Sequence, residues 1–492
     1  MRFSRFFKRL SCYEAFMTNM TLLTDLYQLT MVGGYYLLGK KDQKANFDFF
    51  FRKIPENGGF CVAAGLEQLV QYIRDIHLEP EEIDYLKSLE LFPDEVIEYL
   101  RRLRFTGDIY AVPEGTIVFP QEPVIRVTAP LPEAQLIETA LLNIVNFQTL
   151  VATKAARVVI SAAGDPVVEF GVRRAQGPDG GLSAARAAFI GGAAATSNVM
   201  AGKVFGIPVR GTMAHSWVES FPSEVESFRA FGKVYPQNCM LLVDTYDTLR
   251  SGVPNAIQVG KELRERGKGS LAGIRLDSGD LTFLSREARK MLDDAGFDRT
   301  RIMGSSDLDE GLIESIKKQG AEIDLWGVGT RLVTSYSCPA LGGVYKLSAV
   351  FEDGVMRPKL KVSDDPDKAT NPGVKKIIRF YDERNFMRGD LILFEDERLP
   401  SGKPIKAFHP ILPHVSKTYP VQFRREEILV PIFRDGKLVY SLPKLPEIQK
   451  KTLENLTNLR AEHKRLQNPH LYHVSLGENL FAKKQELLKA AV

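Results

Sequence analysis

Apolar residues follow two different spacings along the chain, and each spacing predicts a different kind of element. Between about 106 and 128, short apolar runs are separated by Gly and Pro, which predicts several short strands in a small β-rich layer. From 132 to 163, apolar residues recur at helical spacing without a further Pro, which predicts a long helix that packs this layer against the next part of the chain. A domain boundary is therefore expected near 155.

Between 167 and 332 the pattern changes to short apolar runs that each end in polar residues. Two helices are predicted after the fourth and fifth of these runs, SREARKMLDDAGF and LDEGLIESIKKQG, and Asp307 and Glu310 have the spacing of a capping box for the second helix. Alternating strands and helices predict a parallel α/β architecture, either an open doubly wound sheet or a closed barrel. The six units are VVEFGVRRAQG, IPVRGTMAHS, MLLVDTYDT, AGIRLDSGDL, IMGSSDLDE and DLWGVGTRL.

Beyond about 350 the chain becomes charged and irregular. The stretch KVSDDPDKATNPG has the composition of a turn-rich link, and EEILVPIFRDGKLVY that of strands joined by a DGK hairpin turn. TLENLTNLRAEHKRL predicts a basic helix, whose charges are most simply a solvated surface and not a nucleic-acid site.

The composition excludes several classes of protein. At 492 residues, with 44% hydrophobic and 26% charged positions, the chain is typical of a globular protein of several domains, and it holds no apolar run long enough to span a membrane. Lys and Arg exceed Asp and Glu by four, but residues 1–16 supply three of that excess, so no nucleic-acid partner is expected. Four widely spaced cysteines without a CxxC pair argue against disulfides or structural zinc, and favour a reducing, cytoplasmic location.

Residues 1–16 are considered apart from the fold. Their Arg, Phe and Ser content with a single acidic residue resembles a transit-type or membrane-touching segment. Met17 and Met20 come directly after them, and the globular pattern begins beyond these two residues, so an upstream start-codon assignment fits at least as well. We expect residues 1–16 to be an extension outside the folded protein.

Polar residues gather where the six predicted strands end. Arginines and a Gly-rich turn suit a phosphate, and spaced aspartates suit Mg²⁺ or a ribose hydroxyl, so the expected ligand is a phosphorylated sugar held with Mg²⁺. Each signal is weak alone, because GVGT is a common turn, DSGD can cap a helix and the arginine pair can form structural ion pairs. The residues are Arg173, Arg174 and Gln176; Thr212 and His215; Asp244 and Asp247; Arg275, Asp277 and Asp280; Ser305, Ser306 and Asp307; and Gly327, Gly329 and Thr330.

His215 is separated from the other six histidines, which lie at position 77 or from 409 onward. A lone histidine beside apolar neighbours is more often a hydrogen-bonded core residue than a functional one. Its position at a predicted strand end, among the polar residues just named, is what favours a function.

Several motifs, in order along the chain, resemble the nicotinate phosphoribosyltransferase family. They are TDLYQLTM (24–31), FFFRKIPENGGF (49–60), EFGVRRAQG (169–177), GTMAHS (211–216), LVDTYDT (242–248), RLDSGD (275–280), GVGT (327–330), LGGVYKL (341–347) and the tail HKRLQNPHLYHVSL. The resemblance implies a type II phosphoribosyltransferase fold, with an irregular β/α barrel at 156–350 and an α/β accessory domain built from 17–155 and 351–492. It also implies a cytoplasmic homodimer with active sites shared between subunits.

The family's reaction joins nicotinate to phosphoribosyl pyrophosphate and supplies NAD biosynthesis by the Preiss-Handler route. ATP is a co-substrate, Mg²⁺ is a cofactor, and ATP hydrolysis is coupled through a phosphorylated histidine, which the motif match places at His215. An imidazole can attack the γ-phosphoryl group, and the resulting phosphoramidate adds negative charge to the site.

The resemblance also implies roles for the other site residues. Asp244 is expected to orient His215, and Asp277 to hold the ribose or the metal, so that Asp244 and Asp277 are the metal candidates. For nicotinate the implied residues are Thr212, Arg275, Phe170 and the partner subunit's Tyr27; for phosphoribosyl pyrophosphate they are Arg173, Gly327, Gly329, Thr330 and the partner subunit's Arg52.

Three alternatives are weighed against this interpretation. A nicotinamide phosphoribosyltransferase carries an aspartate where this chain has Ser197 or Asn198, and that acid would repel a carboxylate. A quinolinate phosphoribosyltransferase would need a second carboxylate pocket, and its motifs do not match. A catalytically inactive barrel that serves as an interaction protein would be expected to lose His215 or Asp277, and both are present.

Overall fold

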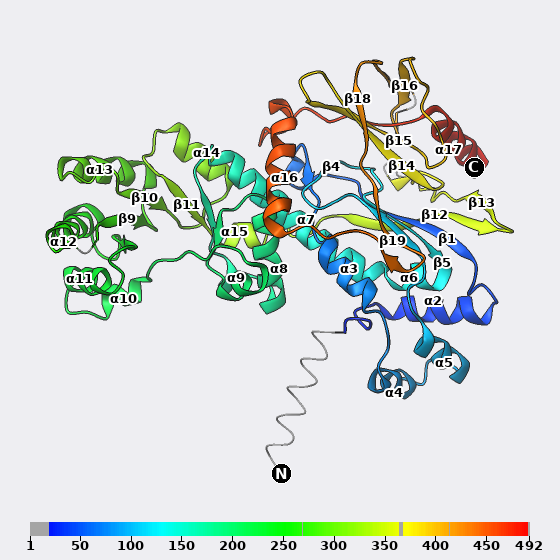
Figure 1. The fold of residues 1–492 in the computed structure, drawn as a ribbon, viewed down its shortest axis with the longest axis horizontal. Helices are drawn as coiled ribbons and strands as arrows, with labels where there is room; N and C mark the ends of the chain where they lie inside the picture. Colours follow the sequence, from blue (N-terminus) through cyan, green and yellow to red (C-terminus); the bar gives the residue numbers. More distant parts are fainter. Residues whose placement is uncertain (1–18, 268, 364–367, 413, 491–492) are drawn as a thin grey trace, which may run out of the picture. The chain divides into compact units, whose positions relative to one another are not determined.

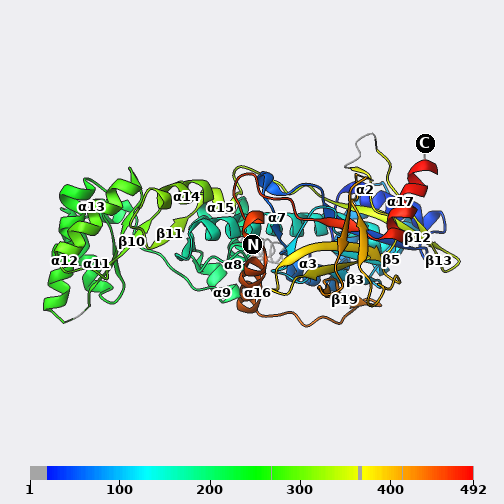
Figure 2. The same cartoon turned by 90° about the horizontal axis from the view of Figure 1, so that it is seen from above.

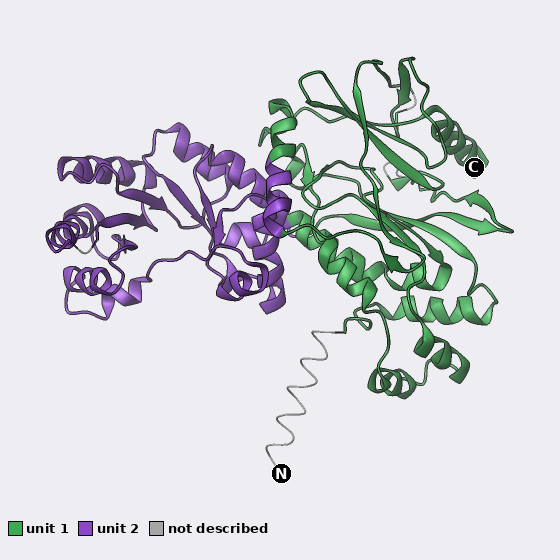
Figure 3. Ribbon diagram, viewed as in Figure 1, with its two compact units in different colours: residues 1–150, 340–444, 454–492 green, residues 151–339, 445–453 purple. Residues whose placement is uncertain are grey.

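The structure, a computed structural model, describes residues 19–267, 269–363, 368–412 and 414–490. The expected extension at 1–16 lies outside these residues. The described residues form two compact units, one within the ranges 1–150, 340–444 and 454–492 and the other within 151–339 and 445–453 (Figure 3). We refer to them as unit 1 and unit 2.

Unit 2 is built on six parallel strands, in the order β7-β6-β11-β10-β9-β8, of which β9, β10 and β11 are labelled in Figure 1. This is the cyclic order of a barrel that is open between its edge strands β7 and β8, which confirms the expected irregular β/α barrel. The strands are β6 (Val167–Glu169), β7 (Ala195–Thr196), β8 (Cys239–Leu242), β9 (Leu271–Leu276), β10 (Arg301–Gly304) and β11 (Leu325–Val328).

Helices cover the strands because each has one apolar stripe to bury. Helices α11, α12 and α13 lie against β8, β9 and β10 (Figures 1 and 2). The helices of unit 2 are α8 (Gly177–Ile190), α9 (Val199–Phe205), α10 (His215–Glu219), α11 (Glu224–Val234), α12 (Val253–Glu265), α13 (Leu281–Asp294), α14 (Glu310–Lys318) and α15 (Thr330–Val333), with short helical turns η2 (Val172–Arg174) and η3 (Thr248–Gly252).

Two local predictions in unit 2 were wrong. The stretch 207–216 is not a strand: only Val209 forms a bridge, with Thr196, because Pro208 has no N–H to donate to a ladder. The N-cap of α14 is Asp309 and not Asp307, since the Asp309 carboxylate accepts the amide of Leu312 at 2.8 Å.

Unit 1 combines both ends of the chain. Its seven-stranded antiparallel sheet has the order β13-β12-β1-β5-β3-β19-β20, with β1 (Lys44–Phe51), β3 (Asp108–Ala111), β5 (Ile125–Pro130), β12 (Gly343–Glu352), β13 (Val355–Pro358), β19 (Val430–Arg434) and β20 (Lys437–Leu438). Because β1 pairs with β12 and β3 pairs with β19, this sheet is built from segments near both ends of the chain.

A second sheet of unit 1 has the order β17-β16-β21-β15-β14-β18, and β2 (Cys61–Val62) pairs with β4 (Ile117–Val118). The strands are β14 (Lys375–Tyr381), β15 (Met387–Phe394), β16 (Ile405–Phe408), β17 (Ser416–Tyr419), β18 (Arg424–Glu427) and β21 (Val474–Leu476). The helices are α2 (Leu26–Leu37), α3 (Leu66–Arg74), α4 (Pro80–Ser88), α5 (Asp94–Arg102), α6 (Leu131–Leu136) and α17 (Glu478–Ala490), while α7 (Glu138–Ser161) and α16 (Leu445–Asn458) belong partly to each unit.

The predicted DGK hairpin is confirmed, and the predicted basic helix was placed too far along the chain. Asp435 and Gly436 join β19 to β20 with φ of 47° and 72°, the left-handed pair that a tight hairpin turn requires. Helix α16 begins at Leu445 and ends at Asn458, so the basic residues at 460–466 lie beyond it. No helix among the described residues is both long enough and apolar enough to cross a bilayer.

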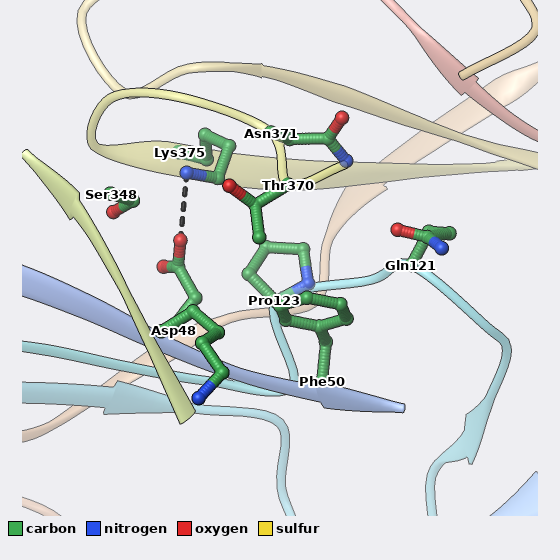
Figure 4. A pocket seen from close by; sticks show the side chains of 9 residues that line it. Asp48, Phe50, Gln121, Pro123, Ser348, Thr370, Asn371 and Lys375 are labelled. Carbon is green, nitrogen blue, oxygen red and sulfur yellow. Dashed lines mark ion pairs between the residues drawn. The ribbon is translucent and has the colours of Figure 1, made fainter. Parts of the chain in front are cut away.

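A buried ion pair joins the two sheets of unit 1. Asp48 of β1 and Lys375 of β14 meet at 2.7 Å, with side chains only 5% and 2% exposed (Figure 4). Burial lowers the pKa of Lys375, and the Asp48 carboxylate opposes that change. Arg126 of β5 adds a hydrogen bond to the Lys375 carbonyl at 2.6 Å. The buried Lys375 ammonium group needs the Asp48 carboxylate, because water cannot reach it to take the place of this partner.

We expect Asp48→Asn to lower the free energy of unfolding of unit 1 by about 3–5 kcal/mol, because the Lys375 ammonium group would be left buried and unpaired. The double variant Asp48→Leu/Lys375→Met should lose much less, since it removes both charges. Urea unfolding measures both effects. Glu352→Gln is the control: it breaks an exposed ion pair with Arg357 and should change the free energy by less than about 1 kcal/mol. Equal losses for the single and double variants would show that the unpaired charge is not the cause.

Candidate active site

Several of the polar residues predicted at the strand ends of unit 2 form one connected cluster around Arg275, the fifth residue of β9. Its Nε donates to Ser305 Oγ at 2.9 Å, and Nη1 donates to Thr212 Oγ1 at 3.1 Å and to the Met213 carbonyl at 3.3 Å. Nη2 donates to Asp277 Oδ1 at 2.8 Å. A guanidinium has five N–H donors, so among the described residues one N–H on Nη2 is left for a ligand.

Asp277 is the acidic member of this cluster. Besides Arg275, its Oδ1 accepts the hydroxyl of Ser305 at 2.5 Å, and Ser305 is buried. Burial opposes ionisation of Asp277, but the Ser305 hydroxyl, the Arg275 charge and the more distant His215 together hold its pKa below the usual value. The Asp277 carboxylate is therefore ionised at neutral pH.

His215 is the first residue of α10, and it meets a carboxylate from the neighbouring strand end. Its Nε2 lies 3.4 Å from Asp244 Oδ1. The His215 side chain is 40% exposed and that of Asp244 is 1% exposed, so His215 is not the core histidine of the alternative interpretation. Asp244 Oδ2 accepts the amide of Asp277 at 2.9 Å and the hydroxyl of Ser278 at 2.6 Å, which fixes the carboxylate.

Phe170 comes directly after β6 and presents its ring beside Arg275. The Arg275 guanidinium carbon is 5.6 Å from the centre of the ring. The ring packs on a small apolar cluster of Val168, Ala195 and Met303. A Cβ at Gly327 of β11 would lie 2.7 Å from the ring, so the position of Phe170 requires a glycine at 327.

The loop before α15 and the two exposed arginines of η2, Arg173 and Arg174, are the parts available to phosphates. Gly329 precedes Thr330, the first residue of α15, where amide groups have no acceptor inside the helix. Asp309 holds this segment through Arg331, with the two charged groups 2.6 Å apart. The Arg173 side chain is exposed and forms no ion pair or hydrogen bond with any described residue.

Other predicted site residues are used differently. Asp280 is the N-cap of α13 and Asp247 caps η3, so both carboxylates serve local structure.

Tyr27 and Arg52 belong to unit 1: Tyr27 lies on α2 and is 49% exposed, and Arg52 lines a cavity of about 320 Å³ with Gln121, His409 and His473.

The structure distinguishes between Ser197 and Asn198. Asn198 caps α9 by accepting the amide of Ala201 at 3.1 Å, and its side-chain amide donates to the Gly181 carbonyl at 3.3 Å. The Ser197 side chain is half-buried and has no hydrogen-bond partner within the described part of the chain. Only Ser197 is therefore free to face a ligand.

Sequence reasoning missed Glu169, Thr196 and Ser278. Glu169 is buried at the end of β6 and hydrogen-bonds the hydroxyl of Thr196 on β7. A charged residue that ends an apolar strand was a usable signal, but its partner lies 27 positions away and could not be identified without the sheet order.

No group of three or more His, Cys, Asp or Glu residues is arranged to hold a metal in the described ranges. Both oxygens of Asp244 accept hydrogen bonds, and one oxygen of Asp277 does. The Oδ2 atom of Asp277 has no described partner. A carboxylate oxygen of this kind can be a ligand of Mg²⁺ when phosphate oxygens complete the coordination shell of the metal.

Comparisons with known proteins agree with the geometry. Residues 22–146 and 374–484 match the nicotinate phosphoribosyltransferase N-terminal and C-terminal domains. The nicotinate phosphoribosyltransferase of Bacillus subtilis (strain 168) is 47% identical over 469 residues, 95% of each chain. Nicotinate phosphoribosyltransferase 2 of Arabidopsis thaliana is 37% identical, covering 94% of this chain and 92% of its own. The crystal structure of human nicotinic acid phosphoribosyltransferase, 32% identical, superposes with a TM-score of 0.83 over 94% of this chain and 99% of that one.

These matches extend over nearly the whole length of the chain, and so they cover the strand ends that carry the cluster around Arg275. Two separate observations, the motifs and the parallel sheet that brings them together, point to the same relatives. The chain belongs to the nicotinate phosphoribosyltransferase family.

Proposed function

We propose that the enzyme transfers the phosphoribosyl group of phosphoribosyl pyrophosphate to nicotinate, forming nicotinate mononucleotide and pyrophosphate for NAD biosynthesis. The observation that carries this proposal is the contact of Arg275 with Thr212 beside the Phe170 ring, at the carboxyl edge of the parallel sheet. An aromatic face with a guanidinium group beside it suits a flat heteroaromatic carboxylate.

The transfer requires little from acid–base groups. The pyridine nitrogen of nicotinate already has a lone pair, so no base is needed to activate it. The site must hold C1′ of the ribose within reach of that nitrogen and stabilise the charge that develops on the leaving pyrophosphate. Residues that position and carry charge are therefore sufficient.

Nicotinate is placed by the free N–H of Arg275. Its carboxylate would accept this N–H and the hydroxyl of Thr212, while the ring lies on Phe170 and, across the dimer, on the partner subunit's Tyr27. Arg275 would make this contact with a single N–H, and not with the usual pair of parallel hydrogen bonds, because its other four N–H groups are already used. The positive charge of Arg275 would also attract the nicotinate carboxylate, since the side chain is only 13% exposed.

Ser197 supports nicotinate over nicotinamide. An aspartate at this position would accept the amide N–H₂ of nicotinamide and would repel a carboxylate, whereas a serine hydroxyl does neither. Because the Asn198 side chain is occupied with capping α9, the neutral Ser197 is the residue that would face the substituent.

Phosphoribosyl pyrophosphate would be held by backbone amides and arginines. Gly327, Gly329 and Thr330 would receive the 5′-phosphate at the start of α15, and Arg173 would meet pyrophosphate oxygens. Asp277, kept ionised by its neighbours, would accept ribose hydroxyls or hold Mg²⁺ through Oδ2. Bound Mg²⁺ would neutralise part of the pyrophosphate charge.

His215 would couple the reaction to ATP. Because Nε2 faces Asp244, the other ring nitrogen, Nδ1, is directed away from that carboxylate and is the one to attack. A nitrogen–phosphorus bond would form to the γ-phosphoryl group as its bond to ADP breaks, and water would later hydrolyse the phosphoramidate. Asp244 would stabilise the positive charge that develops on the ring.

The enzyme would act as a homodimer in the cytoplasm. Exposed Tyr27 and the partly free guanidinium of Arg52, whose Nε is buried without a partner in the described structure, would complete the site of the other subunit. Cys61, Cys239 and Cys338 form no disulfide among the described residues, which fits a reducing compartment.

We expect nicotinate to be used far better than nicotinamide when both are offered with phosphoribosyl pyrophosphate, with and without ATP. Mass spectrometry of the nucleotide products measures the preference. Arg275→Lys should raise the KM for nicotinate at least tenfold, because lysine cannot keep the contacts with Ser305, Thr212 and Asp277. Arg301→Lys, at an exposed position that begins β10, is the control. Equal use of the two pyridines would remove the proposed function.

If Arg52 serves the neighbouring subunit, mixing Arg52→Ala chains with His215→Ala chains should restore part of the ATP-stimulated activity that each variant lacks on its own. One of the two sites in each heterodimer would then carry neither change. Mixing His215→Ala with Arg275→Ala is the matched control and should restore nothing, since both residues lie in unit 2. Steady-state rates after demonstrated subunit exchange measure recovery, and its absence would place Arg52 in the same subunit's site.

Incubation with γ-labelled ATP should leave acid-labile, base-stable label on the protein, and His215→Ala should abolish it. The variant should keep slow ATP-independent transfer, because the contacts to nicotinate and phosphate do not involve the imidazole. Asp244→Asn should slow labelling without preventing it. His77→Ala, in unit 1, is the histidine control. Label that persists in His215→Ala would show that another residue carries the phosphoryl group.

A further inference from the structure

We infer that Glu169 is a positioning residue that holds Phe170 and Ser197 at a fixed distance and orientation from each other. The inference rests on the proposed function, because it assumes that nicotinate lies against Phe170 with its substituent near Ser197. Glu169 begins the motif EFGVRRAQG, but it was not among the expected site residues.

Glu169 is a buried carboxylate without a cation. It is the last residue of β6 and is 1% exposed, between β7 and β11. No lysine, arginine or histidine in the described structure forms an ion pair with it. Burial raises the pKa of Glu169, and hydrogen bonds from Thr196 and Gly171 reduce this effect. An apolar residue would pack at this strand position more favourably than an unpaired acid, so the acid needs a reason.

The hydrogen bonds of Glu169 enclose Phe170. The Glu169 carboxylate accepts the amide of Gly171, so the residues on both sides of Phe170 are tied together. The Phe170 amide itself donates to the Val328 carbonyl at 2.8 Å. With its backbone held at three successive residues, the ring has little freedom to tilt away from Arg275.

The same residue encloses Ser197. The other carboxylate oxygen of Glu169 accepts the hydroxyl of Thr196 at 2.5 Å, and the Glu169 carbonyl accepts the Ser197 amide at 2.8 Å. The Thr196 hydroxyl in turn accepts the amide of Asn198 at 3.0 Å. One side chain therefore ties the segment that carries the ring platform to the segment that carries the substituent-facing serine.

This arrangement suits discrimination between two pyridines that differ only in one substituent. When the pyridine ring lies on Phe170, its substituent meets Ser197 only if the segments that carry these two residues keep their spacing. Small displacements of substrate can reduce turnover by up to about a hundredfold. A buried carboxylate with two donors fixes the spacing more tightly than apolar packing, because hydrogen bonds are directional.

Glu169→Gln tests the inference with almost no change of shape. A glutamine amide can accept from only one of the two donors and directs its own N–H₂ at the other. We expect the KM for nicotinate to rise roughly tenfold, with a lower ratio of kcat/KM for nicotinate over nicotinamide. The KM for phosphoribosyl pyrophosphate should change less than about twofold, since the loop before α15 is not bonded to this side chain.

Thr196 provides an independent arm. Thr196→Val removes the hydroxyl and should reproduce the rise in the nicotinate KM. Thr196→Ser keeps the hydroxyl and should have the wild-type KM. The double variant Glu169→Gln/Thr196→Val should have a nicotinate KM no higher than that of the more severe single variant. Both changes break the same hydrogen bond, the one between Glu169 and Thr196. If Glu169→Gln fails to fold, the contrast between the valine and serine variants decides the matter alone.

Glu310→Gln is the matched control. Glu310 is also a buried glutamate of unit 2, paired with Lys154 and Arg157 at 2.8 Å each, and its loss should lower the melting temperature without changing the choice of pyridine. The positioning role would be overturned if a folded Glu169→Gln enzyme makes nicotinate mononucleotide with unchanged KM and unchanged discrimination between the two pyridines. That result would leave the proposed function intact. A wild-type enzyme that does not use nicotinate would instead overturn the proposed function.

Discussion

The candidate site depends on keeping one partly buried guanidinium, that of Arg275, hydrogen-bonded near the end of β9. Four of its five N–H groups are used by residues from β9, the end of β10 and the segment before α10, and these contacts bring Ser305, Thr212 and Asp277 into one place. Parallel strands make this possible, because their carboxyl ends meet at one edge of the sheet. The remaining N–H is directed by the same contacts that restrain the others. Arg275 thus organises the protein around it before it binds anything.

The pKa values of two carboxyl groups, those of Asp277 and Glu169, are shifted in opposite directions, and their surroundings explain the difference. Asp277 has a guanidinium and a hydroxyl donor, which lower its pKa in spite of burial. Glu169 has only an amide and a hydroxyl, so burial dominates and its pKa is raised. An ionised acid suits contact with a metal or a ribose, whereas an acid held by neutral donors suits a fixed structural position. The structure supports separate roles for two residues of the same chemistry.

The sequence predicts the repeating part of this fold well, because apolar spacing and strand-end polarity are local signals. It predicts the chemistry of Arg275, Thr212 and Asp277 through motifs, although only the structure shows that the three are in contact. Prediction failed where a contact links distant positions or depends on backbone detail. Glu169 and Thr196 required knowledge that β6 and β7 are neighbours, and Val209 formed only a bridge because Pro208 interrupts the ladder.

Asp244 connects His215, the residue proposed to react with ATP, to the proposed substrate site. One of its oxygens faces His215, and the other accepts the amide of Asp277 and the hydroxyl of Ser278. A phosphoryl group on His215 would change the charge and proton content of the imidazole, and so the strength of its contact with Asp244. Because that carboxylate also holds the backbone of Asp277, the change would reach the residue proposed to meet ribose or Mg²⁺. The coupling then needs no large movement, since a single shared carboxylate connects the histidine with the site.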